Sequence, residues 1–105
     1  MDANEINMKT ELEFQKALLL LDGGDLERGR QKLEDVISQA NDTNDTVTLI
    51  KSVVCLGELL IELGSPEEAI RTLNRALTFQ NDDEALTYEF DRATELLPRV
   101  SKKPW

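Results

Sequence analysis

The segment Gly64-Ser65-Pro66-Glu67-Glu68 limits the possible folds more than any other part of the sequence. Glycine suits the position just after a helix, serine suits the N-cap, and proline suits the first helical position, where its missing N–H is not needed. Glu68 stands three residues after Ser65, which is the spacing of a capping box. The segment therefore predicts that one helix ends and an antiparallel neighbour begins within a few residues.

The rest of the chain carries similar signals. Apolar residues recur at intervals of three and four, as on the buried face of a helix. Gly23-Gly24 predicts another helix end, and Asp25 predicts the cap of the helix that follows. The polar residues 41–46 favour turns and N-caps over helix interiors, so they predict a loop.

We therefore predict an all-α fold with no strand. Asn81-Asp82-Asp83 is expected to cap the last helix, and Pro98 is expected to end it. Residues 1–8 and 98–105 lack a helical pattern and are expected to be flexible. The five predicted helices cover about residues 9–22, 26–39, 46–63, 66–79 and 83–97.

The chain also repeats itself when it is shifted by 40 residues. Small, large and turn residues recur in the same order in the pairs Leu20 and Leu60, Gly24 and Gly64, Glu27 and Glu67, Gly29 and Ala69, and Leu33 and Leu73. The small residue early in each second helix allows two helices to approach closely, and the leucine four residues later fills the space beside it. This order predicts two similar helix pairs.

The second helix pair resembles the tetratricopeptide-repeat (TPR) family. The matching residues are Leu56-Gly57, Leu60, Gly64-Ser65-Pro66-Glu67-Glu68-Ala69, Leu73 and Ala76. The first pair matches at Ala17, Leu20, Gly24-Asp25 and Leu33, and more loosely at Gly29 and Val36. The departures are Val53 where the family often has Trp, Leu60 where Tyr is common, Asn81 where Pro is usual, and Lys16 where Leu is expected.

The resemblance implies a right-handed stack of antiparallel helix-turn-helix units. The repeat units would cover residues 10–43 and 50–83, followed by the terminal helix 83–97, all within one domain of residues 9–97. The family period is 34 residues, so an offset of 40 implies about six extra residues, which we expect in the polar segment 41–46. A generic helical bundle is the alternative, because other helical hairpins share this pattern.

Charge restricts the partners of the chain. Lys and Arg total 12 against 21 Asp and Glu, which gives a net charge of −9. Nucleic acids and anionic membranes bind mainly through clustered Lys and Arg, so neither is expected as a partner. The acidic balance either serves solubility or favours a partner with basic residues.

Catalysis, cofactors and metals are not expected. The chain has no histidine, which is the commonest catalytic acid or base and a common metal ligand. Cys55 is the only cysteine, which fits a reducing compartment. The longest apolar run, 17–21, is too short to span a bilayer, and residues 1–5 lack the start of a signal peptide. We therefore expect a cytoplasmic protein that is not an enzyme.

The TPR resemblance also implies a binding face, formed by the first helix of each unit. The residues at these positions are Glu11, Phe14, Gln15, Leu18, Lys51, Val54, Glu58 and Glu62. Chaperone-binding members use a Lys and Asn carboxylate clamp there, and this chain has Phe14, Leu18, Val54 and Glu58 instead. An amphipathic or basic helix or peptide of another protein therefore suits the face better than a C-terminal carboxylate.

Two functions stay open from the sequence. The first is a protein-interaction module of the adaptor or chaperone kind. The second is a self-associating structural subunit, a homo-oligomer whose groove is filled by its own helix 83–97 or by a second copy of the chain. Repeat folds usually need three or more stacked units for stability, so a chain with two units has reason to complete its stack through a partner.

Overall fold

The all-α fold predicted from the sequence is confirmed. The computed structural model describes residues 3–79 and 84–101, with side chains from residue 8 onward. Five α-helices and one short 3-10 helix form these ranges, which contain no strand. The elements are α1 (Ala3–Asp22), α2 (Leu26–Asp42), α3 (Thr46–Glu62), α4 (Pro66–Leu77), η1 (Glu84–Leu86) and α5 (Thr87–Ser101).

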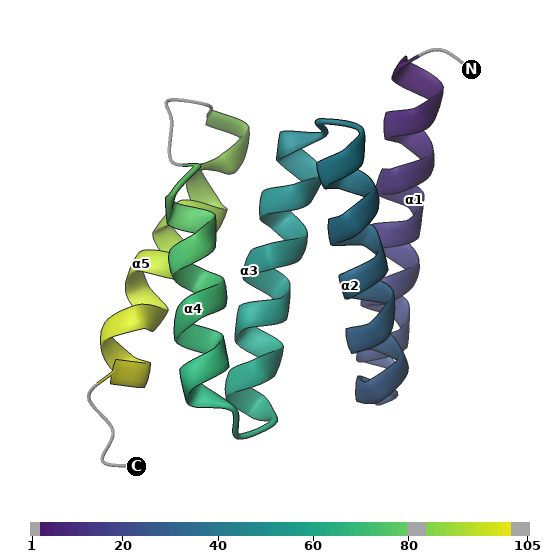
Figure 1. The fold of residues 1–105 in the computed structure, drawn as a ribbon. Coiled ribbons are helices and arrows are strands. Elements are labelled where there is room, and N and C mark those ends of the chain that lie inside the picture. Colours follow the sequence, from purple (N-terminus) through teal and green to yellow (C-terminus); the bar gives the residue numbers. More distant parts are fainter. Residues whose placement is uncertain (1–2, 80–83, 102–105) are drawn as a thin grey trace. The chain divides into compact units, whose positions relative to one another are not determined.

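The chain divides into two compact units, and the boundary along the sequence falls after Ser52 of α3. Unit 1 is Met1–Ser52 and unit 2 is Val53–Trp105. In unit 1, α1 and α2 pack side by side as an antiparallel pair, joined by the turn after Asp22 (Figure 1). In unit 2, α4 packs against α5 (Figure 1).

Three helices end in the same kind of turn, at 20-residue intervals. Gly24, Asn44 and Gly64 have positive φ angles of 87°, 58° and 77°. The N–H of the next residue donates to a carbonyl five residues back in each turn, from Asp25 to Leu20, Asp45 to Ala40 and Ser65 to Leu60, each at 2.9 Å. This pattern belongs to the Schellman motif. The predicted glycine helix ends at 24 and 64 are confirmed, and Asn44 plays the same part because asparagine tolerates the left-handed region.

The predicted loop 41–46 is shorter in the structure. Asn41 and Asp42 belong to α2, and α3 begins at Thr46, which leaves only residues 43–45 between the two helices. The carbonyl groups of Gln39, Ala40 and Asn41 accept the hydrogen bonds of this turn. The helical backbone therefore continues beyond the buried Ala40. Asn41 and Asp42, which were expected in the loop, therefore extend α2 to 17 residues.

The outer helix ends also differ from the prediction. α1 begins at Ala3 instead of residue 9, so residues 3–8 are helical. α5 continues past Pro98 to Ser101, because Val100 is buried and this burial holds the last turn in place. The predicted cap at Asn81-Asp82-Asp83 and the tail after Ser101 lie outside the described residues.

The helix caps follow the prediction at one position and not at another. The Asp25 carboxylate accepts the Arg28 N–H at 3.2 Å, so the predicted cap of α2 is confirmed. Ser65 is the N-cap residue of α4 and Pro66 follows it, but the Ser65 side chain makes no capping hydrogen bond. The predicted capping box is therefore wrong for the Ser65 side chain, which was expected to accept a backbone N–H of α4.

Small residues occupy the close contacts between helices, as the repeat predicts. Ala17 and Ala69 are fully buried. A Cβ atom on Gly29 would lie 2.7 Å from the Cγ of Leu21 in unit 1, and a Cβ on Gly57 would lie 2.7 Å from the Cγ of Leu73 in unit 2. Neither glycine position has room for a methyl group. In unit 2, the close contact between α3 and α4 is that of Gly57 with Leu73. The buried Ala69 stands four residues before Leu73 on α4.

Candidate functional site

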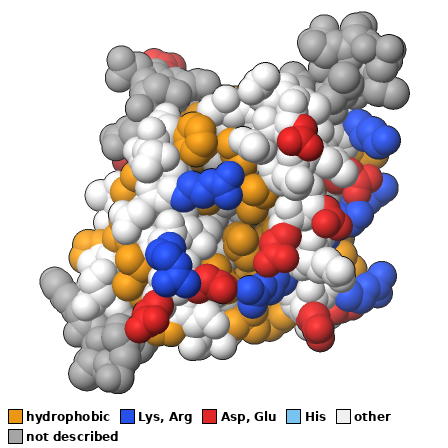
Figure 2. Space-filling view, in the orientation of Figure 1, with side chains coloured by type: hydrophobic (Ala, Val, Ile, Leu, Met, Phe, Trp, Pro, Cys, Tyr) orange, Lys and Arg blue, Asp and Glu red, His pale blue; other side chains and the backbone are white. Residues whose placement is uncertain are grey.

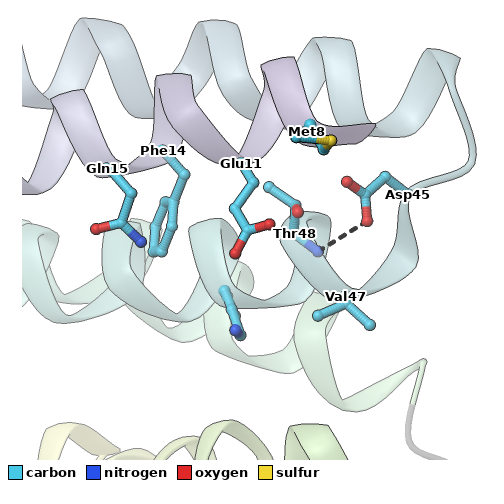
Figure 3. Close-up of a pocket in the computed structure, with 8 residues that line it drawn as sticks. Met8, Glu11, Phe14, Gln15, Asp45, Val47 and Thr48 are labelled. Carbon is cyan, nitrogen blue, oxygen red and sulfur yellow. Dashed lines mark hydrogen bonds between the residues drawn. The ribbon is translucent and has the colours of Figure 1, made fainter. Parts of the chain in front are cut away.

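A cavity in unit 1 brings together residues of α1 and of the first turns of α3. Its volume is about 460 Å³, which is within the range of ligand-binding pockets. The lining residues are Met8, Glu11, Phe14, Gln15, Asp45, Val47, Thr48 and Lys51. We call it the unit 1 cavity. Figure 3 shows the side chains of Glu11, Phe14 and Gln15 extending from α1 toward the start of α3.

Local helix geometry places these side chains. Glu11 and Gln15 are four residues apart on α1, so they lie on one face of the helix. Val47 and Lys51 have the same spacing on α3. The start of α3 is fixed by Asp45, whose carboxylate accepts the Thr48 N–H at 3.2 Å (Figure 3).

The unit 1 cavity has an apolar part. Phe14 is buried and Val47 is half-buried, while Met8 is exposed at the end of the lining. Phe14 therefore belongs to the core of unit 1 and presents only a small part of its ring to the cavity. An apolar side chain entering the cavity would contact Phe14, Val47 and Met8, and would lose its contact with water.

The charged residues of the unit 1 cavity have no partners among the residues that the structure describes. Lys51 is half-buried and Glu11 is exposed, and neither makes a hydrogen bond or an ion pair within residues 8–79 and 84–101. A half-buried ammonium group is more stable with a hydrogen-bonding partner than without one. Within this part of the chain, no other residue occupies either group.

In a second, smaller cavity of unit 1, the charged residues Glu13 and Lys32 do have partners. It has a volume of about 250 Å³ and is lined by Glu13, Lys32, Asp35, Val36, Ser38 and Gln39. Lys32 of α2 donates to Glu13 of α1 at 2.6 Å, and Lys16 contacts the other carboxylate oxygen at 3.1 Å. The hydrogen bond from Lys32 is the main cause of the lowered pKa of Glu13, and Lys16 adds to it. The charged groups here hold α1 and α2 together.

The structure brings together four of the eight residues predicted for the binding face. Glu11, Phe14, Gln15 and Lys51 line the unit 1 cavity. Leu18 is half-buried on α1 and is not part of the lining. Met8, Asp45, Val47 and Thr48 also line the cavity and were not predicted. Val47 stands four residues before Lys51 and Met8 stands three before Glu11, so helical spacing alone points to both.

The other predicted residues belong to unit 2. Val54 is buried, with 3% of its surface exposed, so it offers little to a partner. Glu58 is half-buried and accepts a hydrogen bond from Arg92 of α5 at 2.9 Å. Glu62, the last residue of α3, is exposed. Within unit 2, α5 therefore contacts the predicted face at Glu58.

The surface charge is mixed despite the net charge of −9. On the face viewed in Figure 2, acidic, basic and hydrophobic side chains alternate with one another. Neither acidic nor basic side chains form a single block on this face.

The residues that the structure describes contain neither a membrane-spanning helix nor a metal-binding cluster. None of the helices there combines the length and the apolar character needed to cross a membrane. Likewise, no group of three or more His, Cys, Asp or Glu side chains in the described part of the chain could hold a metal ion. Cys55, the only cysteine of the sequence, is half-buried on α3.

No protein-family model, curated protein or solved structure matches this chain. Its function is therefore argued from its own residues.

Proposed function

We propose that this chain is a protein-interaction module, of the adaptor or chaperone kind, that binds a helix or peptide of another protein at the unit 1 cavity. The observation that carries the proposal is the cavity itself, which combines an apolar part with two charges of opposite sign that have no partner among the described residues. Binding sites on proteins commonly combine an apolar surface with a few polar groups that orient the ligand.

Several features support a TPR-like repeat as the scaffold. Gly24 and Gly64 close their helices with the same hydrogen bonds, 40 residues apart, and small buried residues recur at 17 and 57 and at 29 and 69. Thr46 and Thr87, the first residues of α3 and α5, lie 41 residues apart, close to the 40-residue offset of the repeat. This spacing supports α5 as the first helix of a further, incomplete unit.

The lining of the cavity defines the chemistry of the partner. An apolar side chain of the partner fits between Phe14 and Val47, while polar groups beside it pair with Glu11 and Lys51. The net charge of −9 attracts a partner with basic residues and accelerates its encounter with the chain. We place the protein in the cytoplasm and assign it no catalytic role or cofactor, as expected from its single cysteine and its lack of histidine.

Two synthetic amphipathic helices of equal length test the proposal, one built from leucine and lysine and the other from leucine and glutamate. We expect the lysine helix to bind saturably and to shift the backbone amide NMR signals of Gln15, Val47 and Lys51. Val47→Gln should weaken this binding by about tenfold, because it replaces an apolar contact without changing the charge.

Leu63→Gln is the matched control. Leu63 is also aliphatic and is 40% exposed, but it belongs to unit 2. This substitution should leave the affinity unchanged. Equal binding by the wild type and Val47→Gln, or signals that shift only outside the cavity, would contradict the proposed site. Binding of the glutamate helix alone would contradict the predicted basic partner.

A further inference from the structure

Helix α1 has apolar residues on two opposite faces. The buried face carries Phe14 and Ala17, with the polar Thr10 beside them. The other face carries Met8, Leu12 and Leu19, which are 69%, 56% and 71% exposed. At about 100° per residue, these three side chains lie within about 40° of one another and roughly opposite the buried face. We call them the α1 stripe. Burial against α2 and α3 does not explain why these positions are apolar.

The spacing of the α1 stripe is that of a coiled-coil seam. Met8, Leu12, Gln15 and Leu19 follow one another in steps of four, three and four residues. Seam positions in a coiled coil repeat in this way, so that each side chain meets the partner helix. Gln15 is the polar member of the seam, and polar seam residues are known to fix register.

The two sides of the α1 stripe carry opposite charges. Lys9 and Lys16 follow Met8 and Gln15 directly, on one side of the seam. Glu11 precedes Leu12, on the other side. Residues that flank a coiled-coil seam form pairs between helices and decide the partner and the orientation.

We propose that the α1 stripe binds the α1 stripe of a second copy of this chain, with the two helices parallel. In a parallel pair each basic side faces the acidic side of the other helix, so Glu11 of one copy lies beside Lys16 of the other. The five-residue step between Glu11 and Lys16 is the one that such interhelical pairs use. In an antiparallel pair, lysines would face lysines.

Self-complementarity favours a second copy over an unlike partner. The stripe supplies the apolar seam and both members of the charged pair, and a twofold axis then forms each pair twice. α1 is already held in place by α2, so little ordering cost opposes association. Lys16 contacts Glu13 of its own chain at 3.1 Å, but it is half exposed, and such surface pairs contribute little.

The proposal goes beyond the proposed function and does not depend on it, because Leu12, Lys16 and Leu19 do not line the unit 1 cavity. Met8, Glu11 and Gln15 belong to both surfaces, so self-association is measured on the full chain without any peptide. Sedimentation equilibrium over a range of concentrations should give the mass of a dimer. The variant Leu12→Glu/Leu19→Glu should be monomeric and keep its helical circular dichroism, since both side chains are exposed.

Leu63→Glu is the control for an added charge away from the stripe and should remain dimeric. Glu11→Lys and Lys16→Glu should each raise the dissociation constant of the dimer by about tenfold. The double variant Glu11→Lys/Lys16→Glu should restore it, because the pair is re-formed with reversed signs. A monomeric wild type would overturn the proposal, as would a dimer that survives Leu12→Glu/Leu19→Glu. A double variant whose dissociation constant stays raised would overturn the parallel arrangement.

Discussion

Arg92 of α5 donates its Nε–H to Oε1 of Glu58 on α3 at 2.9 Å. This ion pair raises the pKa of the Arg92 guanidinium, chiefly through the hydrogen bond to Glu58. Within unit 2, the last helix thus satisfies a charge on the face that was predicted to bind a partner. In unit 1, Glu11 and Lys51 have no such partner among the described residues. Among the described residues, the residues predicted to bind a partner therefore make an ion pair in unit 2 and none in unit 1.

Removing the Glu58–Arg92 pair should loosen α5. We expect Arg92→Met to lower the free energy of unfolding by up to about 1 kcal/mol, because both side chains are about one third exposed and solvent screens the pair. Urea denaturation measures the change. A double-mutant cycle with Glu58→Gln should give a coupling energy above zero, and additive effects of the two substitutions would show that the pair contributes nothing.

Gly57→Ala should destabilise unit 2. The added Cβ would lie 2.5 Å from Cδ2 and 2.7 Å from Cγ of Leu73, which is itself fully buried. Overpacking of this kind costs about 1–3 kcal/mol. Gly23→Ala is the matched control, since its Cβ would come no closer than 3.4 Å to another atom and its φ angle is not positive. Equal melting temperatures of the two variants would refute the close approach of Gly57 and Leu73.

The helix caps should respond unequally to alanine substitution. Asp25→Ala removes a carboxylate that accepts the Arg28 N–H, and should lower the free energy of unfolding by about 1 kcal/mol. Ser65→Ala should cost less, because the Ser65 side chain makes no capping hydrogen bond. Thermal denaturation of both variants checks the order. A larger loss for Ser65→Ala would mean that its hydroxyl caps α4 in solution.

The Glu13–Lys32 pair predicts a pH dependence of stability. The folded-state pKa of Glu13 lies below its ordinary value of 4.5, so the unfolded chain binds the proton more tightly. Its contribution is therefore present above about pH 4.5 and is lost as the pH falls through the folded-state pKa. Lys32→Met should be less stable than the wild type at pH 7, and the gap should narrow below pH 4.5. A gap that stays constant in urea titrations down to pH 3 would contradict this origin.

The helix ends could be predicted where the residues of the turn itself identify it. Gly24 and Gly64 identify their turns because few other residues adopt positive φ. Asn44 closes a third turn of the same kind, but it lies among polar residues that all favour turns, so its role was hidden in a longer predicted loop. The end of α5 was missed because Pro98 is a local stop signal, whereas the burial of Val100 is a tertiary effect.

The candidate site could be predicted only in part, for a similar reason. Spacing along α1 and α3 and the family resemblance identified Glu11, Gln15 and Lys51. Spacing does not reveal that Val47 and Asp45 complete the same cavity, because that depends on how the start of α3 meets α1. Nor does it reveal that Arg92 pairs with Glu58, since no local pattern links residues 34 positions apart.

The regular placement of the turns at 24, 44 and 64 constrains how the length of this chain can change. Each 20-residue segment carries the chain along one helix and reverses its direction once. Insertion of one such segment would reverse the direction of every later helix. Insertion of two would add a complete helical hairpin and leave the direction of the later helices unchanged. Viable natural or engineered length variants should therefore differ by about 40 residues, or by changes confined to the helix ends.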